Sequence, residues 1–123
     1  MKMTKRAFSE LILDASPSEV SNALMQIMYS SRIIVKSQTF TEQPLTIHLY
    51  GEHSATFRSW GEIIRITITE NGNGSKVKAE SEAKLPTTIF DYGQNKENLE
   101  ILLNQLVMKF RNSSPLVIEE RTF

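Results

Sequence analysis

Two predicted strands followed by one terminal amphipathic helix constrain the fold of this chain most strongly. Residues 60–70 and 75–84 alternate apolar and polar side chains, which is typical of strands with one buried face. Between them Asn71-Gly72-Asn73-Gly74 predicts a hairpin turn, because Asn and Gly tolerate positive φ. A helix is predicted over residues 95–111, because apolar residues recur there at helical spacing: Leu99, Leu102, Leu103, Leu106 and Phe110. An α+β fold is therefore expected, with the helix packed on an antiparallel sheet.

The inner face of the strand over residues 75–84 carries small side chains. Its inward positions are Val77, Ala79, Ser81 and Ala83, whereas the alternate positions hold Lys and Glu. One face of the sheet is therefore expected to contact water and the other to be covered. Small inner residues allow a helix to approach closely, or they leave room for a cavity, and the sequence leaves both possibilities open.

The N-terminal half predicts a strand, a helix and a further strand pair. Residues 6–13 alternate as a strand, and Ser16-Pro17-Ser18-Glu19 has the cap, proline and glutamate of a helix start. That helix is expected to end near Ser30. Strands are then predicted over residues 33–40 and 45–50.

The length of 123 residues fits one domain, which we assign to residues 1–111, followed by a C-terminal tail over residues 112–123. Lys and Arg together number 14, as do Asp and Glu, so no overall charge favours nucleic acid. The basic N-terminus lacks the long apolar run of a signal peptide, and no segment is apolar enough to span a membrane. A cytoplasmic location is therefore expected.

Two stretches carry a resemblance to a known superfamily. They are Ala15-Ser16-Pro17-Ser18-Glu19-Val20 after the first strand, and residues 90–99, preceded by Ser59-Trp60-Gly61-Glu62. With the element order, they resemble the helix-grip fold of the START-like (SRPBCC) superfamily, which includes the birch-pollen-allergen relatives, and within it a short bacterial branch. The resemblance implies a curved antiparallel sheet wrapped around the C-terminal helix, with one helix after the first strand.

In that superfamily the space between sheet and helix often holds an apolar ligand. The resemblance therefore implies non-catalytic binding of a small apolar or amphipathic molecule, with no cofactor. The residues expected to line the space are Ile64, Ile66, Ile68, Val77, Ala79, Ser81, Leu99, Leu102, Leu103 and Leu106. The residues expected at its mouth are Tyr50, Arg58, Trp60 and Asp91.

Polar residues surround the predicted start of the last helix. Asp91, Asn95 and Asn98 are expected to cap it by accepting hydrogen bonds from free backbone N–H groups, and Gly93 to supply an unusual backbone angle. The alternative is a polar rim at the mouth of a ligand cavity.

The histidines offer little catalytic or metal-binding chemistry. His48, Glu52 and His53 lie close in sequence, but a third metal ligand at a recognisable spacing is missing, so no metal site is predicted. His53 falls within residues 51–59, which fit either a loop or a strand. A cyclase-like or hydrolase-like enzyme remains an alternative, which a cleft holding His48 or His53 beside Arg58 and a carboxylate would favour.

A protein–protein interaction module with a filled core is the other alternative. Ile101 and Met108 lie on the helix face opposite the apolar stripe, and Leu116-Val117-Ile118 adds an apolar segment to the tail. These residues would form the contact surface of a homodimer or bind another partner, or the tail would cover that helix face. The superfamily includes a co-chaperone domain that activates a heat-shock ATPase, which by analogy makes a partner-binding role plausible.

Overall fold

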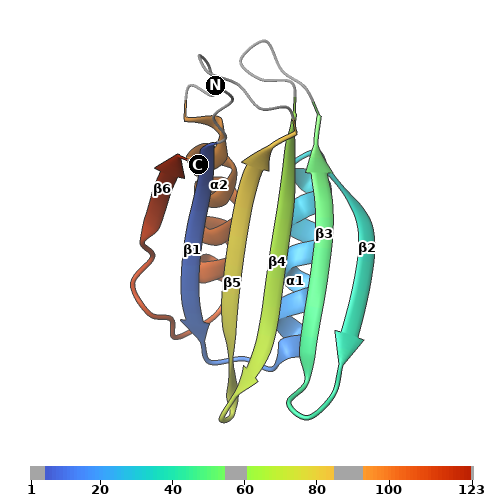
Figure 1. Ribbon diagram of the computed structural model, residues 1–123. Coiled ribbons are helices and arrows are strands. Elements are labelled where there is room, and N and C mark those ends of the chain that lie inside the picture. Colours follow the sequence, from blue (N-terminus) through green and yellow to red (C-terminus); the bar gives the residue numbers. More distant parts are fainter. Residues whose placement is uncertain (1–4, 55–60, 85–92, 123) are drawn as a thin grey trace.

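A six-stranded antiparallel sheet and two helices make up the fold (Figure 1). The computed structural model describes residues 5–54, 61–84 and 93–122. The sheet has the order β2-β3-β4-β5-β1-β6. Its strands are β1 (Lys5–Leu13), β2 (Ile33–Thr41), β3 (Thr46–His53), β4 (Glu62–Asn71), β5 (Gly74–Ala83) and β6 (Ile118–Thr122). The helices are α1 (Pro17–Ser30) and α2 (Gln94–Lys109).

Both helices cover the same face of the sheet. α1 contacts β2, β3, β4 and β5, whereas α2 contacts β1, β5 and β6, and the two helices contact each other. Figure 1 shows them side by side behind the sheet, with the other face open to solvent. The α+β architecture predicted from the sequence is confirmed. In the part of the chain that the structure describes, neither helix is long and apolar enough to cross a membrane.

The start of α1 follows the predicted cap. The Ser16 hydroxyl accepts a hydrogen bond from the backbone N–H of Glu19 at 3.3 Å, and Pro17 occupies the first helical position. Proline fits there because its missing N–H would have no partner within the helix. The helix ends at Ser30, as its apolar spacing predicts.

The hairpin of β4 and β5 supplies the centre of the core. Gly72 adopts a φ of 59° in the turn, and the strands pair from Asn71↔Gly74 to Glu62↔Ala83. In this register the inward isoleucines of β4 lie opposite the small inward residues of β5, as predicted from their alternation. The β4–β5 pair therefore presents an apolar surface to both helices.

The segment after residue 50 continues as a strand. β3 extends to His53, which settles the choice between loop and strand for residues 51–53; residues 55–60 lie outside the described part. Gly51 is needed in this strand, because a Cβ there would meet the Met28 side chain at 2.7 Å and that of Ile33 at 3.0 Å.

The C-terminal residues correct the prediction of a tail. Ile118–Thr122 forms β6, which pairs antiparallel with β1 from Ser9↔Ile118 to Lys5↔Thr122. The Ser9 hydroxyl also donates a hydrogen bond of 2.7 Å to the carbonyl of Val117. A strand of five residues carries too little alternation to be recognised alone, and its stability here comes from the exposed edge of β1.

Candidate functional site

A cluster of buried polar side chains lies where α2 begins. Its members are at most 3% exposed: Glu62, Ser81, Gln94, Asn95 and Asn98. Glu62 opens β4, Ser81 lies near the end of β5, and the other three occupy the first turns of α2. We call this set the polar cluster. Burying so many polar groups costs free energy unless each is hydrogen-bonded, so its connectivity matters.

The hydrogen bonds of the polar cluster centre on Asn98. Its side-chain N–H groups donate to Glu62 Oε1 at 2.8 Å and to Ser81 Oγ at 3.2 Å. The Ser81 hydroxyl donates to Asn95 Oδ1 at 2.9 Å, and the Asn95 amide donates to the backbone carbonyl of Lys5 at 3.0 Å. The cluster therefore joins α2 to three neighbouring strands: β4, β5 and β1.

The side-chain amide of Gln94 is the other part of the polar cluster. Gln94 Nε2 donates to Asn98 Oδ1 at 2.9 Å. Gln94 Oε1, on the same amide, is buried and has no hydrogen-bond partner among the residues that the structure describes. A buried polar atom left in this way costs about 1–3 kcal/mol. Such an atom is unusual in a folded protein and points to a position where a bound molecule could contribute a donor.

His53 adds a titratable group at the edge of the polar cluster. Its Nδ1 lies 3.1 Å from Glu62 Oε1, and its side chain is 17% exposed. The contact has the distance of an ion pair but not the angles of a hydrogen bond, since Nδ1 has no hydrogen-bond partner within residues 5–54, 61–84 and 93–122. The enzyme alternative requires a cleft that holds His48 or His53 beside Arg58 and a carboxylate. The contact of His53 with Glu62 meets one part of this condition, whereas Arg58 lies outside the described residues.

The capping role predicted for Asn95 and Asn98 is wrong. Gly93 occupies the N-cap position of α2 with a φ of 75°, and no side chain of the described residues, Asn95 and Asn98 included, caps the helix there. Asn95 and Asn98 instead lie on the inward stripe of α2, each four residues before a buried leucine, Leu99 and Leu102 respectively. The prediction for Gly93 is confirmed, and Asp91 lies outside the described part of the chain.

The ten residues predicted to line a ligand space lie buried on the helix-covered side of the sheet, where β4 contacts α1 and β5 contacts both helices. All are at most 3% exposed, and the apolar ones belong to one core cluster. The Ser81 hydroxyl contacts Asn95 and Asn98 directly. The small side chain at this inner position therefore allows α2 to approach β5 closely. Whether a ligand reaches any of the ten stays a prediction.

Two hollows in the surface of the described residues lie away from that interface. The larger, of about 660 Å³, is on the solvent face and includes Phe8, Arg65 and Arg121. The other, of about 580 Å³, includes Met25, Tyr29 and Ile34, where the end of α1 meets β2. Of the ten predicted lining residues, the larger hollow includes Ala79 and the smaller includes none.

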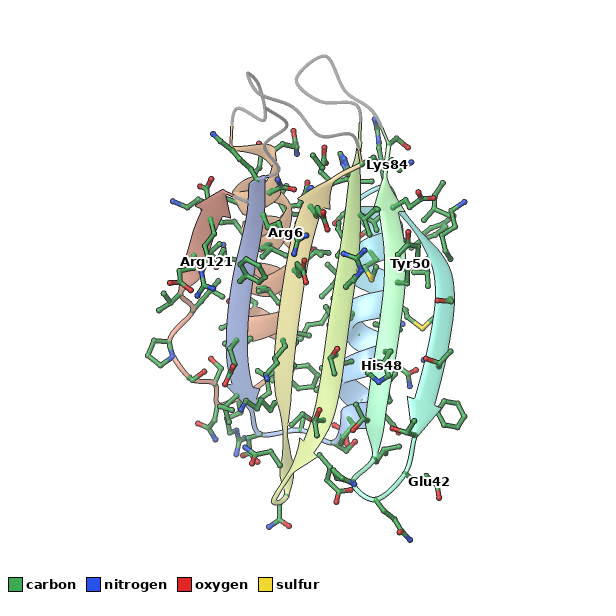
Figure 2. All side chains as sticks on the ribbon, in the orientation of Figure 1. Arg6, Glu42, His48, Tyr50, Lys84 and Arg121 are labelled. Atoms are coloured by element: carbon green, nitrogen blue, oxygen red, sulfur yellow. The ribbon has the colours of Figure 1, made fainter. Side chains whose placement is uncertain are left out.

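The predicted cavity mouth is not assembled among the described residues. Tyr50 lies on the face of the sheet away from α2, because it alternates with the buried Leu49 and Gly51 (Figure 2). The Arg65 guanidinium lies 5.9 Å from the centre of its ring. Placing Tyr50 at the mouth was therefore wrong. Arg58, Trp60 and Asp91 lie outside the described residues.

His48 and Glu52 have separate surroundings. His48 is exposed, with its Nδ1 3.4 Å from the Thr67 hydroxyl. The hydrogen bond from Lys84 is the main cause that lowers the pKa of Glu52, with Lys36 contributing further. Across residues 5–54, 61–84 and 93–122, no group of three or more metal-binding side chains is present.

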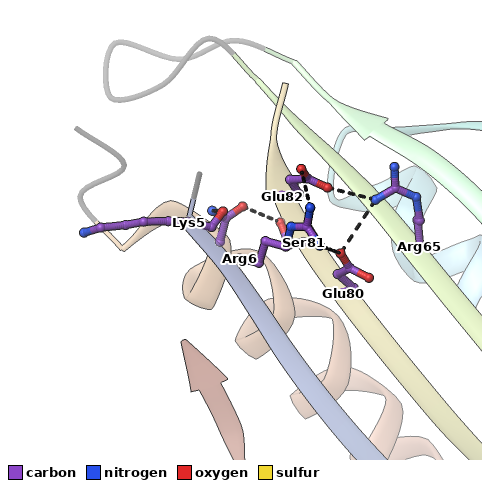
Figure 3. Close-up of polar contacts among 7 residues, drawn as sticks. Lys5, Arg6, Arg65, Glu80, Ser81 and Glu82 are labelled. Carbon is purple, nitrogen blue, oxygen red and sulfur yellow. Dashed lines mark hydrogen bonds and ion pairs between the residues drawn. The ribbon is translucent and has the colours of Figure 1, made fainter. Parts of the chain in front are cut away.

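Ion pairs cover the solvent face of the same strands. Arg65 contacts Glu82 at 3.1 Å and Glu80 at 3.7 Å, and Arg6 contacts the same two glutamates at 3.3 and 3.7 Å (Figure 3). These side chains are partly exposed, so each pair contributes at most about 1 kcal/mol. The polar cluster on the opposite face is buried, so its hydrogen bonds have more consequence for stability.

Comparison with known proteins supports the fold. The architecture matches the solved structure entitled "Crystal structure of Ara h 8.0201" with a TM-score of 0.51 and 8% sequence identity. The match covers 86% of this chain and 97% of the other. The chain has the helix-grip fold. No family model and no curated protein matches the sequence, so this helix-grip chain is placed by its architecture alone.

Proposed function

We propose that this helix-grip chain binds a small apolar or amphipathic molecule, without catalysis, between the sheet and α2. The polar end of the molecule would lie at the polar cluster, and its apolar part would meet the adjoining core. The observation that carries the proposal is the buried Gln94 carbonyl oxygen, which has no hydrogen-bond partner in the described part of the chain. A ligand that supplies a donor would remove the cost of leaving that atom unpaired.

The fold and the surroundings of the polar cluster support this location. Farther along α2, the space against the sheet is filled by Leu102, Leu103 and Leu106, each at most 1% exposed. Near the polar cluster the apolar neighbours are smaller, with Ala7 opposite Ser81 and Ala83 opposite Glu62. Ligand sites typically combine an apolar wall with a few fixed polar groups, and the start of α2 offers both.

Native mass spectrometry of gently purified protein tests the proposal. We expect an extra non-covalent mass of a few hundred daltons, on the order of a drug-sized ligand, that disappears on denaturation. Gln94→Leu should lose this mass, because the unpaired acceptor is removed. The matched control is Gln105→Leu, at an exposed position of the same helix, which should retain it. Equal retention by both variants would place the ligand elsewhere.

A second candidate, homodimerisation or binding of a protein partner, rests on exposed apolar side chains of α2. Ile101 is 41% exposed and Met108 is 85% exposed, whereas Leu116 and Ile118 pack partly against the core. If this surface binds a second copy, the native mass would be that of two bare chains. The double variant Ile101→Ser/Met108→Ser would then be monomeric, and an unchanged dimer would exclude this surface.

A further inference from the structure

We propose that the hollow between the end of α1 and β2 binds a small amphipathic carboxylate, an organic acid whose apolar body fills the hollow and whose carboxylate pairs with Arg32. We call this surface the α1–β2 hollow. It shares no residue with the polar cluster and is built from other elements, so this inference goes beyond the proposed function and is tested separately from it.

The wall of the α1–β2 hollow consists of apolar side chains from two elements. Met25 and Tyr29 lie one helical turn apart on α1. Three successive residues of β2 complete the wall: Ile33, Ile34 and Val35. Ile33 is 4% exposed and belongs to the core, whereas Tyr29 is 87% exposed and Ile34 is 56% exposed. An apolar ligand seated here would remove the surface of both exposed side chains from water, which favours binding.

The size and position of the α1–β2 hollow suit a small molecule. Its volume of about 580 Å³ falls within the roughly 300–1,000 Å³ typical of small-molecule sites. β2 is an edge strand, with β3 as its neighbour on one side (Figure 1). The hollow is therefore open at the edge of the sheet, where a ligand reaches it without passing through the core.

Arg32 supplies the polar contact of the α1–β2 hollow. It joins α1 to β2 with a φ of 61°, which is uncommon for a residue other than glycine, and its backbone N–H donates to the Tyr29 carbonyl at 3.3 Å. The Arg32 side chain lines the hollow and makes no hydrogen bond or ion pair with the residues that the structure describes. A guanidinium with free N–H donors matches a carboxylate through two parallel hydrogen bonds.

The charges beside the α1–β2 hollow also favour an anion. The pairing of β2 with β3 places Glu52 opposite Ile34. The Glu52 carboxylate already contacts two lysines, Lys84 at 3.1 Å and Lys36 at 3.5 Å. Two cations around one carboxylate leave a net positive charge at this corner of the sheet, to which Arg32 adds. A ligand carboxylate would be attracted here, and a ligand amine would be repelled.

The end of α1 does not cancel this preference. The last carbonyl groups of a helix carry partial negative charge, which disfavours an anion nearby. In α1 these carbonyls already accept hydrogen bonds: Ile27 and Met28 accept from the backbone N–H of Ser31, and Tyr29 accepts from Arg32. A full positive charge on the guanidinium therefore outweighs the remaining partial charge of the helix end.

Three probes with one apolar body and different polar ends test this inference. They are 4-phenylbutanoate, 4-phenylbutanamide and 4-phenylbutylamine, each titrated into the full chain and followed by amide chemical shifts in ¹H–¹⁵N NMR spectra. We expect the carboxylate to bind about tenfold or more tightly than the neutral amide, with the amine weakest. The largest shifts should fall at Met25, Tyr29, Ser54 and residues 32–35.

A pair of arginine variants connects the preference to Arg32. Arg32→Gln should reduce the preference for the carboxylate over the amide to about threefold or less, because the charge is removed. The matched control is Arg111→Gln, at an exposed arginine after α2, which should leave the preference unchanged. Circular dichroism checks that both variants fold. A preference that survives in Arg32→Gln would overturn the role of Arg32.

A second pair of variants tests the apolar wall. Ile34→Ser should weaken binding of the carboxylate and the amide by the same factor, about fivefold, because it removes apolar contact and leaves the charge in place. The matched control is Phe40→Ser, at a 66% exposed position of the same strand outside the hollow, which should bind both probes as the unchanged chain does. Equal weakening by both variants would overturn the placement of the apolar body.

The outcomes separate this inference from the proposed function. Shifts confined to the start of α2 would place the probe at the polar cluster, which would overturn the α1–β2 site and support the proposed function. Equal affinity of the carboxylate and the amide for the unchanged chain would overturn the selection of an acid. Failure of the carboxylate to bind at millimolar concentration would overturn the site itself, whereas the native mass spectra would still decide the proposed function.

Discussion

Replacing Asn98 by alanine should destabilise the protein far more than its position on a helix suggests. The change removes two donated hydrogen bonds, to Glu62 at 2.8 Å and to Ser81 at 3.2 Å, and one accepted from Gln94 at 2.9 Å. The bond to a carboxylate contributes about 1.5–3 kcal/mol, and each of the other two about 0.5–1.5 kcal/mol. Alanine returns roughly 0.5 kcal/mol through its higher helix propensity. The expected loss is therefore about 2–5.5 kcal/mol.

The matched control is Asn104→Ala, the same substitution on the exposed face of the same helix. It should change stability by about 0.5 kcal/mol or less, because Asn104 is exposed and alanine favours the helix. Urea unfolding followed by circular dichroism gives both free energies, provided that the m-values agree. If Asn98→Ala were less than about 1 kcal/mol more destabilising than Asn104→Ala, the polar cluster would not stabilise the fold as argued.

Three further predictions follow from other contacts. Leu102→Ala should cost about 2–5 kcal/mol in urea unfolding, because Leu102 is fully buried on the inward side of α2; a smaller cost would mean a loosely packed core. Gly74→Ala should be destabilising by the same assay, since a Cβ there would overlap the Leu13 carbonyl oxygen; a neutral effect would contradict the close approach of the hairpin to β1. Lys84→Met should raise the pKa of Glu52 toward 4.5 in an NMR titration, and an unchanged pKa would exclude the pairing. Because the folded-state pKa of Glu52 is lowered, its contribution to stability is present above the unfolded-state pKa and lost as pH falls through the folded-state pKa.

The sequence predicted the elements well where a repeated pattern was long. The alternation in β4 and β5 and the cap of α1 rest on local physics, and the structure confirms them. β6 was not predicted, because its five residues gain their stability from pairing with β1. Each residue of β6 lies 109 or more positions away in the sequence from its partner in β1.

The burial of the polar cluster could have been predicted from the sequence. Asn95, Asn98 and Leu99 precede Leu102 by seven, four and three residues, which places all of them on one helical face. Glu62 likewise continues the inward alternation of the isoleucines in β4. The polar side chains of Asn95 and Asn98 favoured a capping role, whereas their helical spacing favoured burial. They are buried in the structure because groups on the strands supply their hydrogen-bond partners. Those partners could not be read from the sequence, since they depend on the register of β4 with β5.

That same register explains why one end of the sheet–α2 interface differs from the rest. Moving along β5 toward its end, inward Val77 and Ala79 give way to Ser81, while β4 places Glu62 opposite Ala83. A fully apolar interface would be more stable at this end, because a buried carboxylate carries a desolvation cost even when hydrogen-bonded. The chain instead retains Glu62, which accepts a hydrogen bond from Asn98, and Asn98 also bonds Ser81 and Gln94. Within the described part of the chain the buried Gln94 oxygen has no hydrogen-bond partner, and a ligand of the proposed kind would remove the cost of that atom by supplying a donor.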